Sequence, residues 1–90
     1  MSLYVATYDI SDNRRRTHVA RVLLQYGTRL QRSVFEVWLE PAELDEFRRE
    51  VGVLLAVADD FVLMPVDERG TRSTYSWQRP LQRFDAVILV

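Results

Sequence analysis

The stretch LYVATYDISD, residues 3–12, decides the fold. Residues 3–8 are apolar toward both faces and rich in β-branched and aromatic side chains, which is typical of a central strand. Asp9 follows this strand directly, and Ser11 or Asp12 is well suited to cap a helix that begins immediately afterwards. The stretch therefore predicts a strand that passes into a helix through a short acidic connection.

The helix and the next strands follow from spacing and composition. Apolar residues recur at the helical interval up to about residue 26, namely at Val19, Val22, Leu23 and Tyr26. Gly27 stands where a left-handed C-terminal cap is expected. Residues 28–39 favour extended structure, with a tight turn or bulge at residues 31–33 that predicts a hairpin or one bent strand pair.

The second half of the chain repeats this order. Pro41 suits the first turn of a second helix, which we expect to end at residues 59–60. Residues 61–66 form another strand, residues 68–83 a polar irregular loop, and residues 84–90 a last strand that pairs at a dimer interface. The order predicts one α+β domain over residues 1–90. It is a ferredoxin-like βαββαβ fold with an antiparallel sheet, both helices on one face and an extra C-terminal strand.

Composition excludes several classes of site. The chain has 90 residues and no cysteine, so disulfides, thiolate metal sites and cysteine nucleophiles are excluded. His18 is the single histidine, which excludes a histidine-rich zinc site within one chain. No signal peptide or membrane-spanning stretch is expected, and we expect a cytoplasmic protein. At this size a homodimer that buries more surface is a reasonable expectation.

The net charge of −1 conceals a pattern. Residues 1–39 hold six arginines and three acidic residues, a net charge of +3. Residues 40–68 hold nine acidic residues and two arginines, a net charge of −7, and residues 69–90 return to +3. All twelve basic residues are arginine, which makes bidentate contacts with phosphate that lysine does not. This arrangement predicts either a basic and an acidic face or helix surfaces that differ in sign by chance.

Asp9 is the first candidate for chemistry. A carboxylate at a strand-to-helix connection can point into a cleft, and its oxygens suit Mg²⁺ or Mn²⁺. One aspartate is too few for a protein cage, but two copies across a twofold axis could supply the missing partner. The alternative is that Asp9 belongs to the helix cap together with Ser11 and Asp12.

Arginines supply the other candidates. Arg14, Arg15 and Arg16 oppose the helix dipole in the first turn, which favours an anion such as phosphate near that terminus. The alternative is a solvated turn balanced by nearby acids. Arg29 and Arg32 lie among aromatic residues, a combination that is typical of nucleic-acid surfaces. The basic and aromatic loop over residues 69–83 could follow a phosphate backbone or span a dimer.

Two motifs in this order carry a resemblance. Residues 8–13 read YDISDN and residues 26–36 read YGTRLQRSVFE. Together they resemble the CRISPR-associated Cas two (Cas2) family, over about the first forty residues. The resemblance implies a homodimer in which Asp9 faces its symmetry mate and holds a divalent metal, usually Mg²⁺. It also implies that the C-terminal strand adds to the partner's sheet.

The resemblance further assigns roles by position. It places Tyr8, Arg16, Arg29 and Phe35 at the active cleft or on nucleic acid, and it leaves the role of His18 open. It implies a metal-dependent endonuclease of RNA or double-stranded DNA that takes part in spacer acquisition with the Cas one (Cas1) integrase. The alternatives are a non-catalytic dimeric scaffold that binds duplex DNA beside that integrase, a toxin-like messenger-RNA nuclease, and a small regulatory domain of the same fold.

Overall fold

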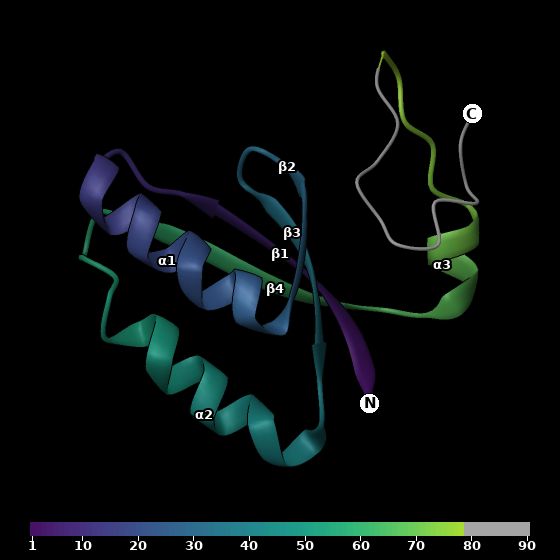
Figure 1. The fold of residues 1–90 in the computed structure, drawn as a ribbon, viewed down its shortest axis with the longest axis horizontal. Coiled ribbons are helices and arrows are strands. Elements are labelled where there is room, and N and C mark those ends of the chain that lie inside the picture. Colours follow the sequence, from purple (N-terminus) through teal and green to yellow (C-terminus); the bar gives the residue numbers. More distant parts are fainter. Residues whose placement is uncertain (79–90) are drawn as a thin grey trace.

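The computed structural model describes residues 1–78 and shows a four-stranded antiparallel sheet in the order β2-β3-β1-β4 (Figure 1). Helices α1 and α2 lie on the same side of this sheet, as a ferredoxin-like βαββαβ fold requires. The elements are β1 (Ser2–Asp9), α1 (Asn13–Tyr26), β2 (Gly27–Gln31), β3 (Val34–Leu39), α2 (Pro41–Gly52), β4 (Asp60–Val66) and α3 (Glu68–Arg72). The strand expected at residues 84–90 lies outside the described residues.

Strand β1 is one of the two central strands of the sheet, as its apolar sequence predicts. It pairs antiparallel with β3 on one side and with β4 on the other, so that Ala6 lies opposite both Phe35 and Leu63. The last pair of the β1–β4 ladder joins Asp9 to Asp60. The carboxyl end of β1 and the beginning of β4 therefore meet at one end of the sheet. None of the helices in the described part of the chain is long and apolar enough to cross a membrane.

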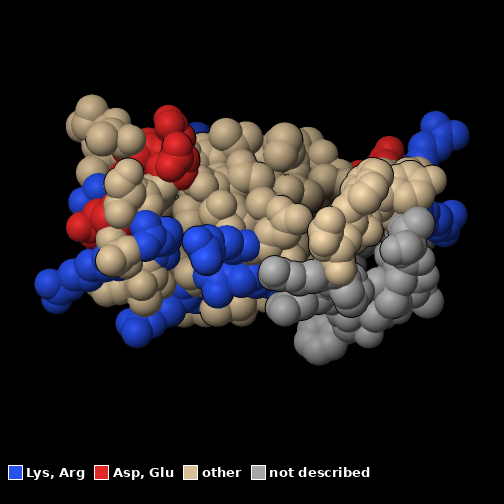
Figure 2. Space-filling model, turned by 90° about the horizontal axis from the view of Figure 1, so that it is seen from above, with Lys and Arg blue, Asp and Glu red and all other residues tan. Residues whose placement is uncertain are grey.

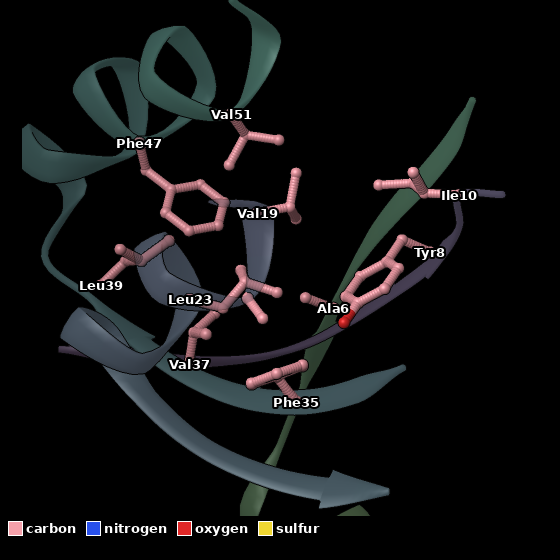
Figure 3. Close-up of a cluster of buried hydrophobic side chains, with 11 residues drawn as sticks. Ala6, Tyr8, Ile10, Val19, Leu23, Phe35, Val37, Leu39, Phe47 and Val51 are labelled. Atoms are coloured by element: carbon pink, nitrogen blue, oxygen red, sulfur yellow. The ribbon is translucent and has the colours of Figure 1, made fainter. Parts of the chain in front are cut away.

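The core lies between the sheet and the two helices (Figure 3). Its largest fully buried side chains are Phe35, Phe47, Leu23, Leu39, Val19 and Val37. Side chains alternate across a strand, so Ala6 and Tyr8 of β1 point toward the helices while Asp9 points to the opposite face. The core thus determines which face of the sheet carries Asp9.

A row of aromatic rings runs through this core. Phe35, Tyr8 and Phe61 stack with centroid separations of 6.0 and 6.5 Å. Phe61 continues the row to Phe47 at 6.4 Å, and Phe47 meets Tyr26 edge-on at 5.2 Å. The row connects the β3 side of the sheet with the surface between α1 and α2, where the Tyr26 hydroxyl donates to a carboxylate of α2. These contacts add directional packing to the burial of apolar area.

Helix α1 begins as predicted and ends differently. The Asp12 side chain caps it by accepting from the Arg15 backbone N–H at 2.8 Å. The left-handed cap predicted at Gly27 is wrong, because φ there is −174° and the residue already belongs to β2. A Cβ at Gly27 would lie 1.7 Å from the Glu36 carbonyl oxygen. The position requires glycine because β3 approaches closely. The extended backbone conformation at this residue would not by itself require glycine.

The second half shows two departures from the sequence prediction. Helix α2 begins at Pro41 as expected but ends at Gly52, well before residues 59–60. Asp59 does not end the helix; its carboxylate instead accepts from the Ala56 N–H at 2.9 Å and shapes the turn that leads into β4. Residues 68–72 form the short helix α3, where an irregular loop is predicted. Its N-cap Asp67 accepts from the Gly70 N–H, a local bond available to many polar loops.

The sheet face opposite α1 and α2 exposes several large apolar side chains. Trp38 of β3 is 47% exposed, and Val62 and Met64 of β4 are 49% and 44% exposed. Asp9 and Asp60 lie at one end of this same face, because directly opposed residues of a ladder project to the same side. We call this surface, made of Trp38, Val62 and Met64, the open face. Large apolar side chains grouped on a sheet face usually mark a contact surface.

Candidate metal and nucleic-acid site

An open pocket of about 430 Å³ lies at the carboxyl end of β1. It brings together the charged side chains of Asp9 and Arg16, both predicted for the site, with that of Arg32, a second arginine. The remaining lining residues are Tyr8, Ile10 and Ser33. One acidic and two basic side chains thus converge around a hollow that the β1–α1 connection and the β2–β3 turn enclose.

Asp9 is exposed at the last position of β1. Its carboxylate makes no hydrogen bond or ion pair with any of residues 1–78, so it does not serve as the helix cap, which is Asp12. Asp60, which lies opposite Asp9 in the ladder, is likewise exposed and unpaired among the described residues. Two like charges opposite one another on neighbouring strands are mildly unfavourable. A bound cation would remove that repulsion.

Tyr8 belongs to the core and to the pocket at once. It is 7% exposed and stacks between two phenylalanines, while its hydroxyl donates to the Arg32 carbonyl oxygen at 3.4 Å. The Tyr8 N–H donates to the Ser33 carbonyl oxygen at 3.2 Å. These two contacts hold the β2–β3 turn against the end of β1. The Arg32 side chain itself makes no hydrogen bond or ion pair with the rest of the described chain.

The three arginines of the first helical turn have different surroundings. Arg16 donates to the carbonyl oxygens of Ile10 and Ser11 at 2.8 and 3.1 Å and to the side chain of Asn13. Arg16 therefore braces the connection that follows Asp9 while it lines the pocket. Arg14 is exposed and makes no such contact with residues 1–78, which leaves its guanidinium available to a phosphate.

Arg15 has an internal partner that spacing does not reveal. Its guanidinium makes a two-point contact with Asp59, at 2.8 Å from Nε and 3.1 Å from Nη2. The Asp59 side chain is 2% exposed, and the hydrogen bond from Arg15, assisted by the Ala56 N–H, lowers the pKa of Asp59. The same contact raises the pKa of Arg15. The role predicted for Arg15 on nucleic acid must therefore compete with a strong internal pair.

Arg29 and Phe35 form a pair on neighbouring strands. The Arg29 guanidinium lies 4.9 Å from the centroid of the Phe35 ring, within cation–π range. Phe35 has no exposed surface in the described part of the chain. Its ring fills the core beside Tyr8 and supports Arg29, whose side chain is exposed, and its assignment to the active cleft or nucleic acid stays a prediction.

Three residues of the site region have no distinctive signal in the sequence. Ser33 enters the pocket through the turn, Asp60 through its register with Asp9, and Asp59 through its contact with Arg15. The acidic pair at positions 59 and 60 is readable as a helix end, and that interpretation does not reveal the contact of Asp59 or the register of Asp60. Knowledge of the strand register would have found Asp60.

Basic side chains gather on one face of the molecule (Figure 2). Several of them lie close together toward the left of this view, with acidic side chains above them, and others lie at the right edge. Arginines placed in this way can neutralise successive phosphates of a nucleic acid, and acidic side chains at the margin limit how far such a ligand extends. The mixed charge along the sequence thus folds into a surface with a local basic concentration.

Comparison with known proteins identifies the family. The family model described as CRISPR associated protein Cas2 matches residues 1–74. The CRISPR-associated endoribonuclease Cas2 2 of Nitrosomonas europaea is 37% identical over an alignment of 84 residues that covers 86% of this chain and 74% of that protein. The crystal structure of Streptococcus pyogenes Cas2 at pH 6.5 superposes with a TM-score of 0.75 at 26% identity, covering 80% of this chain and 94% of that one.

A chain of a partial Cas6-RT-Cas1–Cas2 complex shares the fold, with a TM-score of 0.76 and 20% identity over 86% of this chain and 85% of that one. The residues that the family model matches include the strand that ends in Asp9 and the hairpin that carries Arg29, and the similarity to the Nitrosomonas protein covers most of the chain. The chain therefore belongs to the CRISPR-associated protein Cas2 family.

Proposed function

We propose that this protein is a metal-dependent endonuclease of RNA or double-stranded DNA that takes part in CRISPR spacer acquisition. The observation that carries the proposal is the pocket that the unpaired Asp9 carboxylate lines together with Arg16 and Arg32. A carboxylate beside arginines is suited to a phosphodiester, because the first attracts a cation and the others attract the phosphate. The endoribonuclease name of the Nitrosomonas relative supports the same chemistry.

The donor set fits Mg²⁺, with Mn²⁺ as a substitute. Within residues 1–78 no group of three acidic or histidine side chains could form a complete protein cage. Mg²⁺ commonly binds through one or two carboxylates and completes its shell with water and substrate phosphate oxygens. Asp9 would hold the ion. When bound, the metal supplies polarisation of the phosphodiester and a lower pKa for an attacking water.

The other pocket residues have separable tasks. Arg32, whose side chain is uncommitted among the described residues, binds the phosphate and offsets the charge that develops on its oxygens. Arg16 orients the connection after Asp9 through its bonds to two backbone carbonyls. Tyr8 keeps the turn that carries Arg32 close to the end of β1.

A homodimer would double the site. The open face presents exposed apolar side chains on the side of the sheet that also carries Asp9. Packing of two open faces against one another buries Trp38, Val62 and Met64 and turns the two Asp9 ends toward a common interface. Burial of such side chains is the usual driving force for association. The second carboxylate that Mg²⁺ favours would then come from the second copy.

Asp9→Asn tests the catalytic proposal. The substitution removes the charge and keeps the shape, so Mg²⁺-dependent cleavage of RNA or duplex DNA should fall by about 100-fold or more. Nucleic-acid binding in EDTA should stay unchanged, because Asp9 is not a phosphate ligand. Asp45→Asn, an exposed acid of α2 without a partner among the described residues, is the matched control and should cleave like the wild type. Equal cleavage by Asp9→Asn would contradict the proposal.

A second candidate function is a dimeric scaffold that binds duplex DNA beside the Cas1 integrase. The observation that favours it is the small number of candidate catalytic groups in the pocket, whose lining includes a single carboxylate and no histidine. The fold shared with a chain of a solved Cas1–Cas2 complex is compatible with this function. In a reconstituted integration reaction, the scaffold predicts full activity of Asp9→Asn and reduced activity of Arg14→Ala combined with Arg32→Ala. Loss of activity in Asp9→Asn would support the nuclease, because the scaffold gives that carboxylate no task.

A further inference from the structure

Asp59 is a buried carboxylate that the proposed chemistry does not use. Its side chain is 2% exposed and accepts three hydrogen bonds, two from the Arg15 guanidinium and one from the Ala56 N–H. A buried charge is costly unless paired and hydrogen-bonded, and here both conditions are met by groups from two separate segments. Residues 15 and 59 are 44 positions apart in the sequence. The contact therefore joins parts of the chain that have no local reason to stay together.

The segments that this pair joins leave the sheet at the same end. Arg15 lies in the first turn of α1, three residues after the N-cap of the helix that follows β1. Asp59 directly precedes Asp60, the first residue of β4 and the ladder partner of Asp9. The pair consequently closes a loop around the Asp9–Asp60 end of the sheet. Both connections that flank this end are fixed relative to one another.

Asp9 depends on this surrounding framework for its position. Its carboxylate has no hydrogen bond of its own among residues 1–78, so its place is set by the backbone on either side. The backbone after it is held by Arg16, which binds the carbonyls of Ile10 and Ser11 from the same helical turn as Arg15. If the helix start moves, Arg16 and the connection move with it.

We propose that Asp59, acting through Arg15, is a positioning residue that holds the Asp9 carboxylate in the geometry for binding a divalent cation. The proposal rests on the proposed function, because it assumes that Asp9 binds the metal. Asp59 itself touches neither metal nor substrate. Its effect is carried by the first turn of α1 and by the start of β4, the two elements that the ion pair connects.

Asp59→Asn tests this role with the full-length protein and Mn²⁺ as the probe. The variant keeps the shape and loses the charge that binds Arg15. Mn²⁺ binding is followed by paramagnetic broadening of the backbone amide signals of Tyr8, Asp9 and Ile10 in the NMR spectrum. We expect Mn²⁺ affinity to fall by about tenfold, the lower end of what loss of an outer-shell support produces. The affinity for duplex DNA in EDTA should not fall, because Asp59 is not a phosphate ligand and its loss leaves Arg15 uncommitted.

This measurement separates positioning from stability. The NMR titration reports on folded molecules only, so a role limited to stability would lower the free energy of unfolding and leave Mn²⁺ affinity unchanged. That result would overturn the proposal. Arg15→Gln removes the other partner of the pair and should lower Mn²⁺ affinity to the same extent. It replaces Asp59→Asn as the test if that variant does not fold. The double variant should regain stability by removing both charges while its Mn²⁺ affinity stays low.

Controls distinguish failure of this inference from failure of the proposed function. Asp45→Asn, an exposed acid of α2, should bind Mn²⁺ like the wild type. Asp9→Asn should abolish the broadening. If wild-type signals near Asp9 do not broaden with Mn²⁺, both the metal site and the positioning role are overturned. If Asp9→Asn abolishes binding but Asp59→Asn and Arg15→Gln do not weaken it, only the positioning role falls.

Discussion

Gly27→Ala tests how tightly β2 packs against β3. The added Cβ would lie 1.7 Å from the Glu36 carbonyl oxygen and 2.7 Å from the Val37 Cα. Real Cβ contacts below 3.0 Å essentially do not occur, so the strands must separate by about 1.3 Å or more at this point. The atoms in the way belong to the backbone, so no side-chain rotation relieves the clash.

The expected cost follows from what such a separation breaks. The ladder pairs nearest to the clash are Gly27↔Val37 and Thr28↔Glu36, and a shift of this size ends their hydrogen bonding. Two lost bonds at about 1 kcal/mol each, together with strain of about 1 kcal/mol, lower the free energy of unfolding by about 3 kcal/mol. This is a large share of the stability of a small domain.

Urea unfolding followed by circular dichroism and tryptophan fluorescence measures this change. Protein concentrations must be matched, because any dimer makes stability depend on concentration. Gly52→Ala is the matched control: a Cβ there meets nothing within 4 Å, and we expect stability unchanged or raised by about 0.5 kcal/mol. If Gly27→Ala unfolds within about 0.5 kcal/mol of Gly52→Ala, the close approach of the two strands is refuted.

Two further predictions concern pH and salt. Tyr26 donates to Glu50 at 2.7 Å, and this bond raises the pKa of Tyr26 from 10.0 to about 12. Because Tyr26 ionises at lower pH in the unfolded chain, the stabilisation is fully present below pH 10 and is lost between pH 10 and about 12. The free energy of unfolding of Tyr26→Phe, measured by urea unfolding, should therefore fall less across that range than that of the wild type. Arg29→Ala and Arg32→Ala should each reduce the slope of log affinity for duplex DNA against log salt concentration by about one, whereas Arg48→Ala on α2 should leave it unchanged. Equal slopes in all three variants would contradict phosphate contacts of Arg29 and Arg32.

Local signals in the sequence were sufficient for most of the fold. The apolar run that ends at Asp9 predicts the central strand, and Asp12 and Pro41 mark the beginnings of both long helices where the structure has them. These signals act over a few residues, since a cap or a first-turn proline is determined by its neighbours. The hairpin with its turn after residue 31 follows from the same kind of information.

What the sequence did not reveal depends on contacts between distant segments. Gly27 has the residue type of a helix cap, and only the position of β3 shows that close approach is the reason for it. Asp59 resembles a helix end, because its pairing with Arg15 spans 44 positions. Phe35 matches a family position associated with nucleic acid, yet its burial makes it a support for Arg29. Residue type marked these positions as noteworthy, and tertiary packing decided their roles.

The row of aromatic rings has a consequence for how this pocket can evolve. Tyr8 lines the pocket and is also the middle ring of the row, between Phe35 and Phe61. A substitution that reshapes the floor of the pocket for a different ligand therefore also cuts into the core, and selection for a new specificity meets a penalty in folding. The exposed rim has no such penalty. New substrate preferences should arise first at positions such as Arg32, where the chain can vary without repacking its interior.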